Sequence, residues 1–114
     1  ILVPIPLARS RERERGFNQA ELVARDLASR LGLVVAFPLA RVRNTEQQIT
    51  LASHDARRAN VAGAFRVRDA TAIAGKPVIL VDDVATSGAT FSEAARVLRG
   101  SGARSVWAIA IAKG

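Results

Sequence analysis

Apolar and polar residues follow two recurring patterns along this chain: short apolar runs, and longer amphipathic stretches. The short runs predict strands at 1–3, 33–37, 78–81 and 105–112. The longer stretches repeat apolar residues every three or four positions and meet a glycine at their ends, which predicts helices at 17–31 and 90–100. Strands and helices alternate, which predicts βαβ units with right-handed crossovers. We therefore expect an α/β fold, a doubly wound and mostly parallel sheet with helices on both faces.

The segment from Leu39 to Arg68 has a different pattern. Apolar and basic residues alternate in 39–43 and again in 63–68, as in half-buried strands. The polar stretch between them carries a short predicted helix, capped by Ser53 and reaching Asn60. Both a lid over a binding site and a plain surface hairpin have this pattern. We expect a small irregular lid or hood beside the main sheet.

Composition limits the class of protein. The 114 residues are enough for one domain with a real core, which we assign to 1–114, and the core is aliphatic because only 4% of residues are aromatic. No apolar run is long enough to span a membrane, and no signal peptide is evident. The absence of cysteine excludes disulfides and thiolate zinc sites within these residues, and is typical of a cytoplasmic protein. Because the chain begins inside a predicted strand, we expect a fragment of a longer protein.

The chain is strongly basic, with 17 Lys and Arg against 10 Asp and Glu and a net charge of +7. Two explanations remain open. A GC-rich genome favours arginine codons, and an anionic ligand such as pyrophosphate or nucleic acid favours a basic surface. One Trp and four Phe offer few platforms for stacking single-stranded bases.

The stretch from Val78 to Thr90 carries the clearest candidate chemistry. An apolar strand leads to two adjacent carboxylates, Asp82 and Asp83, at the edge where open α/β sheets bind ligands. Carboxylates suit sugar hydroxyls or Mg²⁺. The following loop suits a phosphate through its backbone N–H groups, its hydroxyls and the start of the next helix. The loop residues are Val84, Ala85, Thr86, Ser87, Gly88, Ala89 and Thr90. A sugar phosphate would satisfy both halves of the stretch.

This stretch resembles the phosphoribosyl-pyrophosphate (PRPP) signature of the type I phosphoribosyltransferases. The resemblance implies that Asp82 and Asp83 are catalytic residues that hold the ribose hydroxyls, and that the loop Val84–Thr90 holds the 5′-phosphate. It implies Mg²⁺ as a cofactor, held indirectly by the two aspartates through ribose hydroxyls or water. It also implies that the basic loop after the first strand holds pyrophosphate, through Arg9 and Arg15, whereas 11–14 reads as solvated surface.

Further stretches resemble one subfamily, the ComF (competence protein F) and GntX-like proteins. These stretches are Pro4–Leu7, Arg13–Ala20, the Asp-Asp loop, and the spaced set Arg43, Thr45, Gln48, Leu51, Arg57 and Asn60 followed by 63–65. Some members of the subfamily act in natural competence, the uptake of single-stranded DNA. Members usually carry a zinc-ribbon-like segment ahead of this domain, and the present chain does not include one.

Two functions are therefore expected as alternatives. In the first, the protein binds PRPP with Mg²⁺ and transfers the phosphoribosyl group to an acceptor, with release of pyrophosphate. In the second, it is a non-catalytic phosphoribosyl- or nucleotide-binding protein in DNA uptake, with single-stranded DNA or competence proteins as partners. Purine-using relatives often carry an acid where this chain has Thr86, and threonine is no general base at neutral pH, so a purine acceptor is disfavoured.

Overall fold

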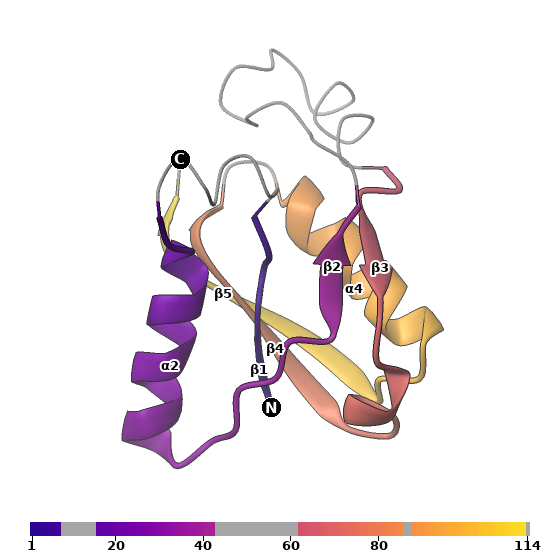
Figure 1. Cartoon of the computed structure of the whole chain (residues 1–114), viewed down its shortest axis with the longest axis horizontal. Coiled ribbons are helices and arrows are strands. Elements are labelled where there is room, and N and C mark those ends of the chain that lie inside the picture. Colours follow the sequence, from indigo (N-terminus) through magenta and orange to yellow (C-terminus); the bar gives the residue numbers. More distant parts are fainter. Residues whose placement is uncertain (8–15, 43–61, 86–87, 114) are drawn as a thin grey trace.

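The computed structural model describes residues 1–7, 16–42, 62–85 and 88–113 (Figure 1). The predictions made for Arg9, Arg15, Thr86, Ser87 and the helix at 53–60 fall outside these ranges. The described elements, in chain order, are strand β1 (Leu2–Pro4), helix α2 (Gln19–Leu31), strands β2 (Leu39–Arg41) and β3 (Phe65–Val67), the 3₁₀ turn η2 (Ala70–Ala72), strand β4 (Pro77–Ala85), helix α4 (Ala89–Gly100) and strand β5 (Ser105–Lys113).

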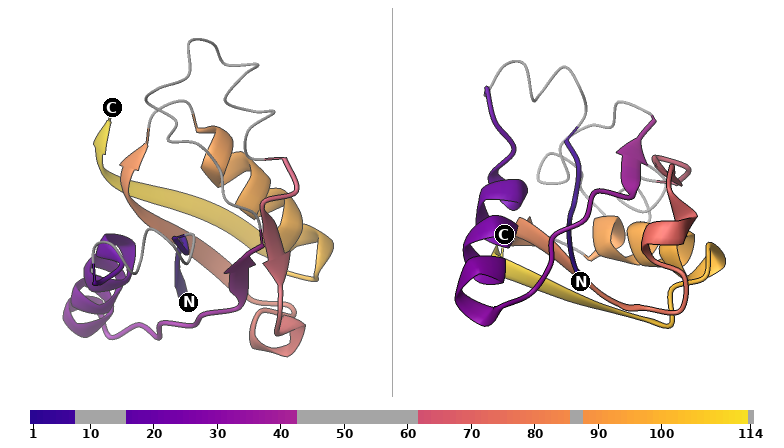
Figure 2. Two further views of the ribbon diagram at one scale, coloured as in Figure 1. Left: turned by 45° about the horizontal axis from the view of Figure 1, so that its top comes forward. Right: turned by 60° about the horizontal axis from the view of Figure 1, so that its bottom comes forward.

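The main sheet has the strand order β1-β4-β5, and both pairs are parallel. Helix α2 covers one face of this sheet and α4 covers the other (Figure 2). The α/β fold with a parallel sheet and helices on both faces is therefore confirmed. None of the helices in the described ranges combines the length and the apolar character that crossing a membrane requires.

The central strand β4 divides the core between the two faces of the sheet. Val78 and Leu80 are fully buried on the face that α4 covers, together with Leu98. Val81 is buried on the opposite face, in one cluster with two small residues of α2 that lie four positions apart, Ala24 and Ala28. Alanine at these positions lets the helix approach the sheet closely. The strand is thus buried on both faces, as a central parallel strand requires.

Strands β2 and β3 form a separate antiparallel pair beside the main sheet. Leu39 and Phe65 are buried in the same cluster as α4, which fixes the pair against that helix. Arg66 points away and is exposed. The two predicted alternating strands are confirmed, and the segment that joins them lies outside the described residues.

Two strand boundaries differ from the prediction. The expected strand at 33–37 is reduced to a single parallel bridge between Val35 and Leu2, with hydrogen bonds to β1 on either side of it. Strand β4 was predicted to end at Val81 and instead continues to Ala85, because β5 runs beside it and pairs with it as far as Lys113. Asp82 and Asp83 therefore belong to the end of the strand itself.

Candidate functional site

Asp82 and Asp83 lie in the C-terminal part of β4, and both are half-buried. The Asp82 Oδ1 atom accepts a hydrogen bond from the Asp83 N–H at 2.8 Å, and the Asp83 Oδ1 atom accepts one from the Val84 N–H at 3.0 Å. Each carboxylate thus uses one oxygen to hold its own position against the next peptide.

The two carboxylates are electrostatically coupled. The pKa of Asp82 is raised to about 7, mainly because burial penalises its charge, and further because it shares a hydrogen bond with Asp83 and feels the charge of that neighbour. The cationic Arg41 acts in the opposite direction and lowers the pKa. Near neutral pH the positive charge beside the two carboxyl groups is therefore too small to balance their negative charge. Hydroxyl donors of a sugar, or a cation, would relieve this shortage.

Arg41 is a site residue that the sequence analysis missed. It ends β2, and its guanidinium lies 5.0 Å from the centroid of the Phe65 ring on the paired strand. Its Nη1 atom donates a hydrogen bond of 3.4 Å to the carbonyl oxygen of Pro6, just beyond β1. The alternation of 39–43 indicated only a strand. Nothing in the local pattern showed that this strand would bring a cation near Asp82 and the end of β1.

The predicted phosphate-binding residues divide between two elements. Val84 and Ala85 were expected in the loop, and this placement was wrong, because both lie in β4 and pair with Ala112 and Lys113. Of the other described residues, Gly88 is the N-cap of α4, and Ala89 and Thr90 are its first two residues, so the helix begins one residue earlier than predicted. Strand β4 extends beyond its predicted end because β5 is long enough to pair with all of it.

The N-terminus of α4 differs from those of the other two helical elements in the described part of the chain. Asn18 and Asp69 cap α2 and η2 with their side chains, whereas the cap of α4 is Gly88, which has no side chain to offer. Gly88 has a φ of 79°, a conformation that glycine adopts without strain. Among the described residues no atom outside its immediate neighbours lies within 4 Å of where its Cβ would stand. The first turn of α4 is therefore suited to an anion.

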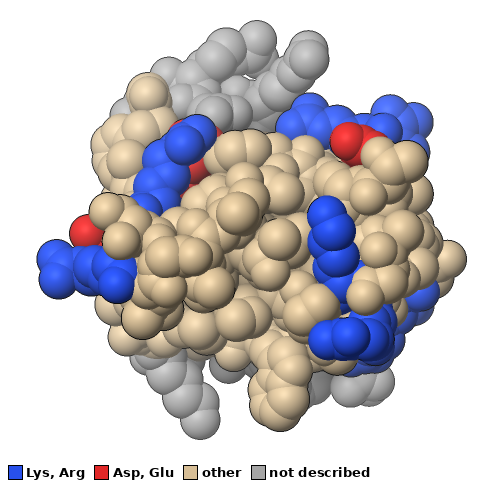
Figure 3. Space-filling view, turned by 90° about the horizontal axis from the view of Figure 1, so that it is seen from below, with Lys and Arg blue, Asp and Glu red and all other residues tan. Residues whose placement is uncertain are grey.

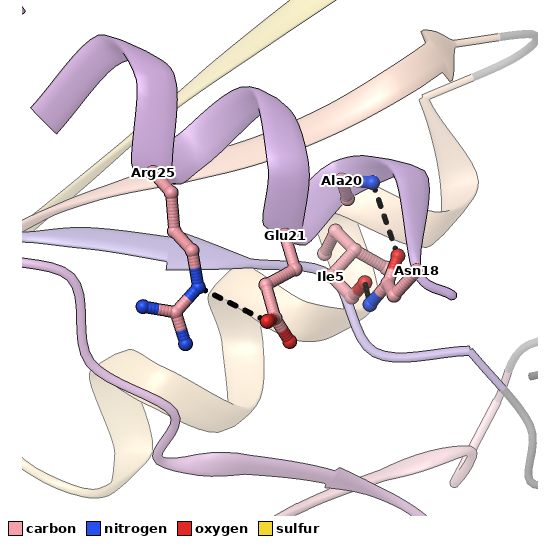
Figure 4. A network of polar contacts seen from close by, with 5 residues as sticks. All are labelled: Ile5, Asn18, Ala20, Glu21 and Arg25. Carbon is pink, nitrogen blue, oxygen red and sulfur yellow. Dashed lines mark hydrogen bonds and ion pairs between the residues drawn. The ribbon is translucent and has the colours of Figure 1, made fainter. Parts of the chain in front are cut away.

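Ile5 and Asn18, which lie on either side of the basic loop, are held near the carboxylates. Asn18 accepts a hydrogen bond from the Ala20 N–H at 3.0 Å and donates one through Nδ2 to the Ile5 carbonyl oxygen at 3.1 Å (Figure 4). Ile5 in turn donates its N–H to the carbonyl oxygen of Val81 at 2.9 Å, immediately before Asp82. The Asn18 side chain thus links the residues that follow the basic loop to Ile5, which precedes it. Ile5 in turn links both to β4.

Further along α2, an ion pair of 3.0 Å joins Glu21 and Arg25 (Figure 4). The Arg25 guanidinium also lies 5.1 Å from the centroid of the Phe37 ring. These contacts fix the helix against the segment that precedes β2. Because they are exposed, they contribute little to stability compared with Asn18.

Asn18→Ala is expected to lower the free energy of unfolding by about 1–2 kcal/mol, because it removes a helix cap and a hydrogen bond to Ile5. The comparison Asn18→Asp separates the two losses, since aspartate keeps the capping oxygen and cannot donate to the Ile5 carbonyl. Urea unfolding of the three proteins measures the difference. Equal stability of wild type and Asn18→Ala would contradict the anchoring role.

A magnesium ion fits this site only together with a substrate. In the described ranges no group of three or more His, Cys, Asp or Glu side chains could hold a metal ion by itself. Mg²⁺ is commonly bound by one or two carboxylates together with substrate oxygens and water. The paired carboxylates, with the raised pKa of Asp82, match that arrangement.

Comparison with known proteins gives the class of protein that this fold and site define. The family model of the phosphoribosyl transferase domain matches residues 18–114, so the chain belongs to that family. No solved structure matches the chain significantly.

Among curated proteins, the chain is similar to competence proteins and to proteins named for DNA utilization. It is 41% identical to competence protein ComFC of Bacillus subtilis over 98 residues, 86% of this chain and 38% of the relative. It is 35% identical to competence protein F of Haemophilus influenzae over 113 residues, 96% of this chain and 49% of the relative. It is 37% identical to DNA utilization protein YhgH of Salmonella typhi over 106 residues, 92% of this chain and 45% of the relative. The chain thus spans less than half the length of these relatives, and the resemblance to ComF-like proteins is confirmed.

Proposed function

We propose that the protein binds PRPP together with Mg²⁺ and transfers the phosphoribosyl group to an acceptor, with release of pyrophosphate. The observation that carries this proposal is the pair of carboxylates, Asp82 and Asp83, at the end of the central strand, followed by the start of α4 with Gly88 as its N-cap. The family match supports it, because the phosphoribosyl transferase domain covers both elements.

Each part of the site has a role in this proposal. Asp82 and Asp83 accept hydrogen bonds from the ribose hydroxyls, and the first turn of α4 at Gly88–Thr90 binds the 5′-phosphate. Arg9 and Arg15 hold the pyrophosphate. Mg²⁺, when bound, supplies positive charge that stabilises the departing pyrophosphate.

The reaction would be a displacement at C1 of the ribose. A nucleophilic atom of the acceptor forms a bond to C1 as the bond from C1 to the pyrophosphate oxygen breaks, and the electron pair leaves with pyrophosphate. Positive charge would develop on the ribose in an oxocarbenium-like state, and in this proposal the negative charge of the carboxylates stabilises it. The protein contributes positioning and charge stabilisation.

Pyrophosphate release tests this activity. Wild type incubated with PRPP, Mg²⁺ and a panel of nitrogen-containing acceptors should release pyrophosphate with at least one of them. The double variant Asp82→Asn with Asp83→Asn should release none above the rate without protein. Equal release by the two proteins would show that the carboxylates have no part in the reaction.

Arg9→Ala is expected to weaken PRPP binding by about 1.5–3 kcal/mol, the scale of a charge-assisted hydrogen bond, and to leave ribose 5-phosphate binding almost unchanged. Ribose 5-phosphate has no pyrophosphate for Arg9 to contact. Isothermal titration with the two ligands measures the difference, and Arg11→Ala is the matched control that should change neither affinity. Equal losses for both ligands on replacing Arg9 would remove it from the pyrophosphate role.

A second candidate function is a non-catalytic cytoplasmic role in DNA uptake, with single-stranded DNA or competence proteins as partners. The names of the relatives favour it, as does the charge of +7. At the end of the molecule where β4 and β5 begin, Lys76 and Arg104 stand side by side, because the Arg104 N–H donates to the Lys76 carbonyl at 2.9 Å. Figure 3 views the molecule from below, where basic side chains outnumber acidic ones.

The salt dependence of oligonucleotide binding tests this second function. If Lys76 and Arg104 contact phosphates, replacing either with Gln should flatten the logarithmic salt slope by roughly 0.7. Arg25→Gln is the control, since Arg25 is paired with Glu21 on the exposed side of α2. An oligonucleotide that does not bind at low salt would exclude direct DNA binding.

A further inference from the structure

The side chain of Arg41 lies on the side of the β2–β3 pair that faces the main sheet. In the antiparallel register Arg41 stands directly opposite Phe65, and directly opposed side chains lie on the same side of a strand pair. Phe65 is buried in one cluster with Val78 and Leu80 of β4. Arg66, the next residue of β3, lies on the other side of the pair and is exposed. The half-buried Arg41 is therefore directed toward β4.

Asp82 lies on the face of β4 that this side of the pair covers. Side chains alternate between the two faces of a strand, so Asp82 shares a face with Val78 and Leu80. Burial raises the pKa of Asp82, and the charge of Arg41 opposes this rise, as expected of a cation on the same face. The face of the strand and the direction of the charge effect thus agree.

The end of β1 brings the guanidinium to the level of the carboxylates along β4. The Ile5 N–H donates to the carbonyl oxygen of Val81, immediately before Asp82, at 2.9 Å. Pro6 follows, and its carbonyl oxygen accepts the hydrogen bond of 3.4 Å from the Arg41 Nη1 atom. Arg41 is therefore held at the same end of the main sheet as Asp82.

The guanidinium is fixed from two sides. It lies over the Phe65 ring, 5.0 Å from the centroid, and it donates from its edge to Pro6. A planar guanidinium can stack on a ring and donate a hydrogen bond in the same arrangement, which the ammonium group of lysine cannot do. The positive charge near Asp82 therefore has a defined place in the fold.

We propose that Arg41 is a positioning residue for Asp82: anchored by Phe65 and Pro6, its guanidinium supplies the positive charge that orients the Asp82 carboxylate toward the ribose. It acts on the ligand through Asp82 and does not contact the ligand itself. Without Arg41, the half-buried carboxylate would stand beside that of Asp83 with less compensating charge. The identity of the ligand rests on the proposed function, whereas the link between Arg41 and Asp82 does not.

A double-mutant cycle in the unliganded protein tests this link. Urea unfolding at pH 8 is measured for wild type, Arg41→Gln, Asp82→Asn and the double variant. Arg41→Gln should lower the midpoint of unfolding by more in the wild-type background than in the Asp82→Asn background, where the charge at position 82 is gone. The control Arg66→Gln should have the same effect in both backgrounds. An equal effect of Arg41→Gln in the two backgrounds would overturn the proposal.

Isothermal titration with PRPP and with ribose 5-phosphate, each with Mg²⁺, measures the consequence for binding. Arg41→Gln should weaken both ligands about tenfold, because both contain the ribose that Asp82 is proposed to hold. Arg41→Lys keeps the charge and should recover part of the affinity. Arg66→Gln, on the exposed side of the same strand pair, should bind both ligands as wild type does.

The two ligands also separate positioning from direct contact. A loss confined to PRPP would show that Arg41 contacts the pyrophosphate itself, and unchanged affinities for both ligands would show that it has no part in binding. Either result would overturn the proposal. A wild type that binds neither ligand would contradict the proposed function, and the cycle in the unliganded protein would still decide whether Arg41 acts on Asp82.

Discussion

PRPP with Mg²⁺ is expected to stabilise wild type by about 2.7 kcal/mol at a hundredfold excess over the dissociation constant, and the double variant Asp82→Asn with Asp83→Asn is expected to lose this stabilisation. The native state alone presents both carboxylates at the end of β4, so the ligand binds it in preference to the unfolded chain. Asparagine keeps the shape of aspartate and removes the charge. Thermal unfolding with and without ligand measures the effect.

The matched control for this experiment is Asp69→Asn. Asp69 is an exposed aspartate that caps η2, in a different part of the fold from the carboxylate site. This variant should keep the full shift of the melting temperature by PRPP and Mg²⁺. A wild type whose melting temperature does not respond to saturating PRPP and Mg²⁺ would contradict the proposed site, whatever the variants do.

Asp82→Asn alone is expected to stabilise the unliganded protein at alkaline pH. The pKa of Asp82 is about 7 in the folded protein and 3.8 in the unfolded chain, so the folded state holds the proton more tightly. The resulting stability is fully present below pH 3.8, declines as the pH rises, and is lost once the pH passes 7. The gain of the variant over wild type should therefore be larger at pH 8 than at pH 5, by about 1–2 kcal/mol after allowance for partial solvent contact.

Urea unfolding of wild type and Asp82→Asn at the two pH values measures this gain. Asp69→Asn is the control, and its effect on stability should have the opposite sign, because a hydrogen bond from Thr71 lowers the pKa of Asp69. Its stabilising contribution is present above the unfolded pKa of 3.8 and is lost as the pH falls through the lowered folded value. A gain for Asp82→Asn that does not change with pH would show that Asp82 is not held in an unfavourable charged state. A residue whose charge lowers the stability of the folded protein in this way is typical of a functional site.

Much of the fold could be predicted because local patterns and tertiary structure agree. The apolar run Val78–Val81 has no polar residue to place in water, so it must be a strand buried on both faces. Helix α2 ends where predicted, at Leu31 before Gly32, whose φ of 68° is the left-handed conformation expected of a helix end. The carboxylates then follow at the edge of the sheet, where a ligand site is expected.

What the sequence did not reveal depends on contacts between distant segments. The end of β4 at Ala85 is set by its pairing with Lys113 of β5, 28 positions later along the chain (113 − 85). Arg41 donates a hydrogen bond to the carbonyl of Pro6, 35 positions away along the chain, and no local pattern predicts such a contact. Trp107 sits in a run that predicts a buried strand, yet its exposure follows from the edge position of β5 and the limited reach of α2.

A crystal structure of the protein with PRPP and Mg²⁺ tests the central claim most directly. We expect the ribose hydroxyls within hydrogen-bond distance of the Asp82 and Asp83 carboxylates, and the 5′-phosphate against the backbone N–H groups at the start of α4. The same ligand bound elsewhere on the molecule, or crystals grown in saturating PRPP and Mg²⁺ with no ligand at the end of β4, would contradict it.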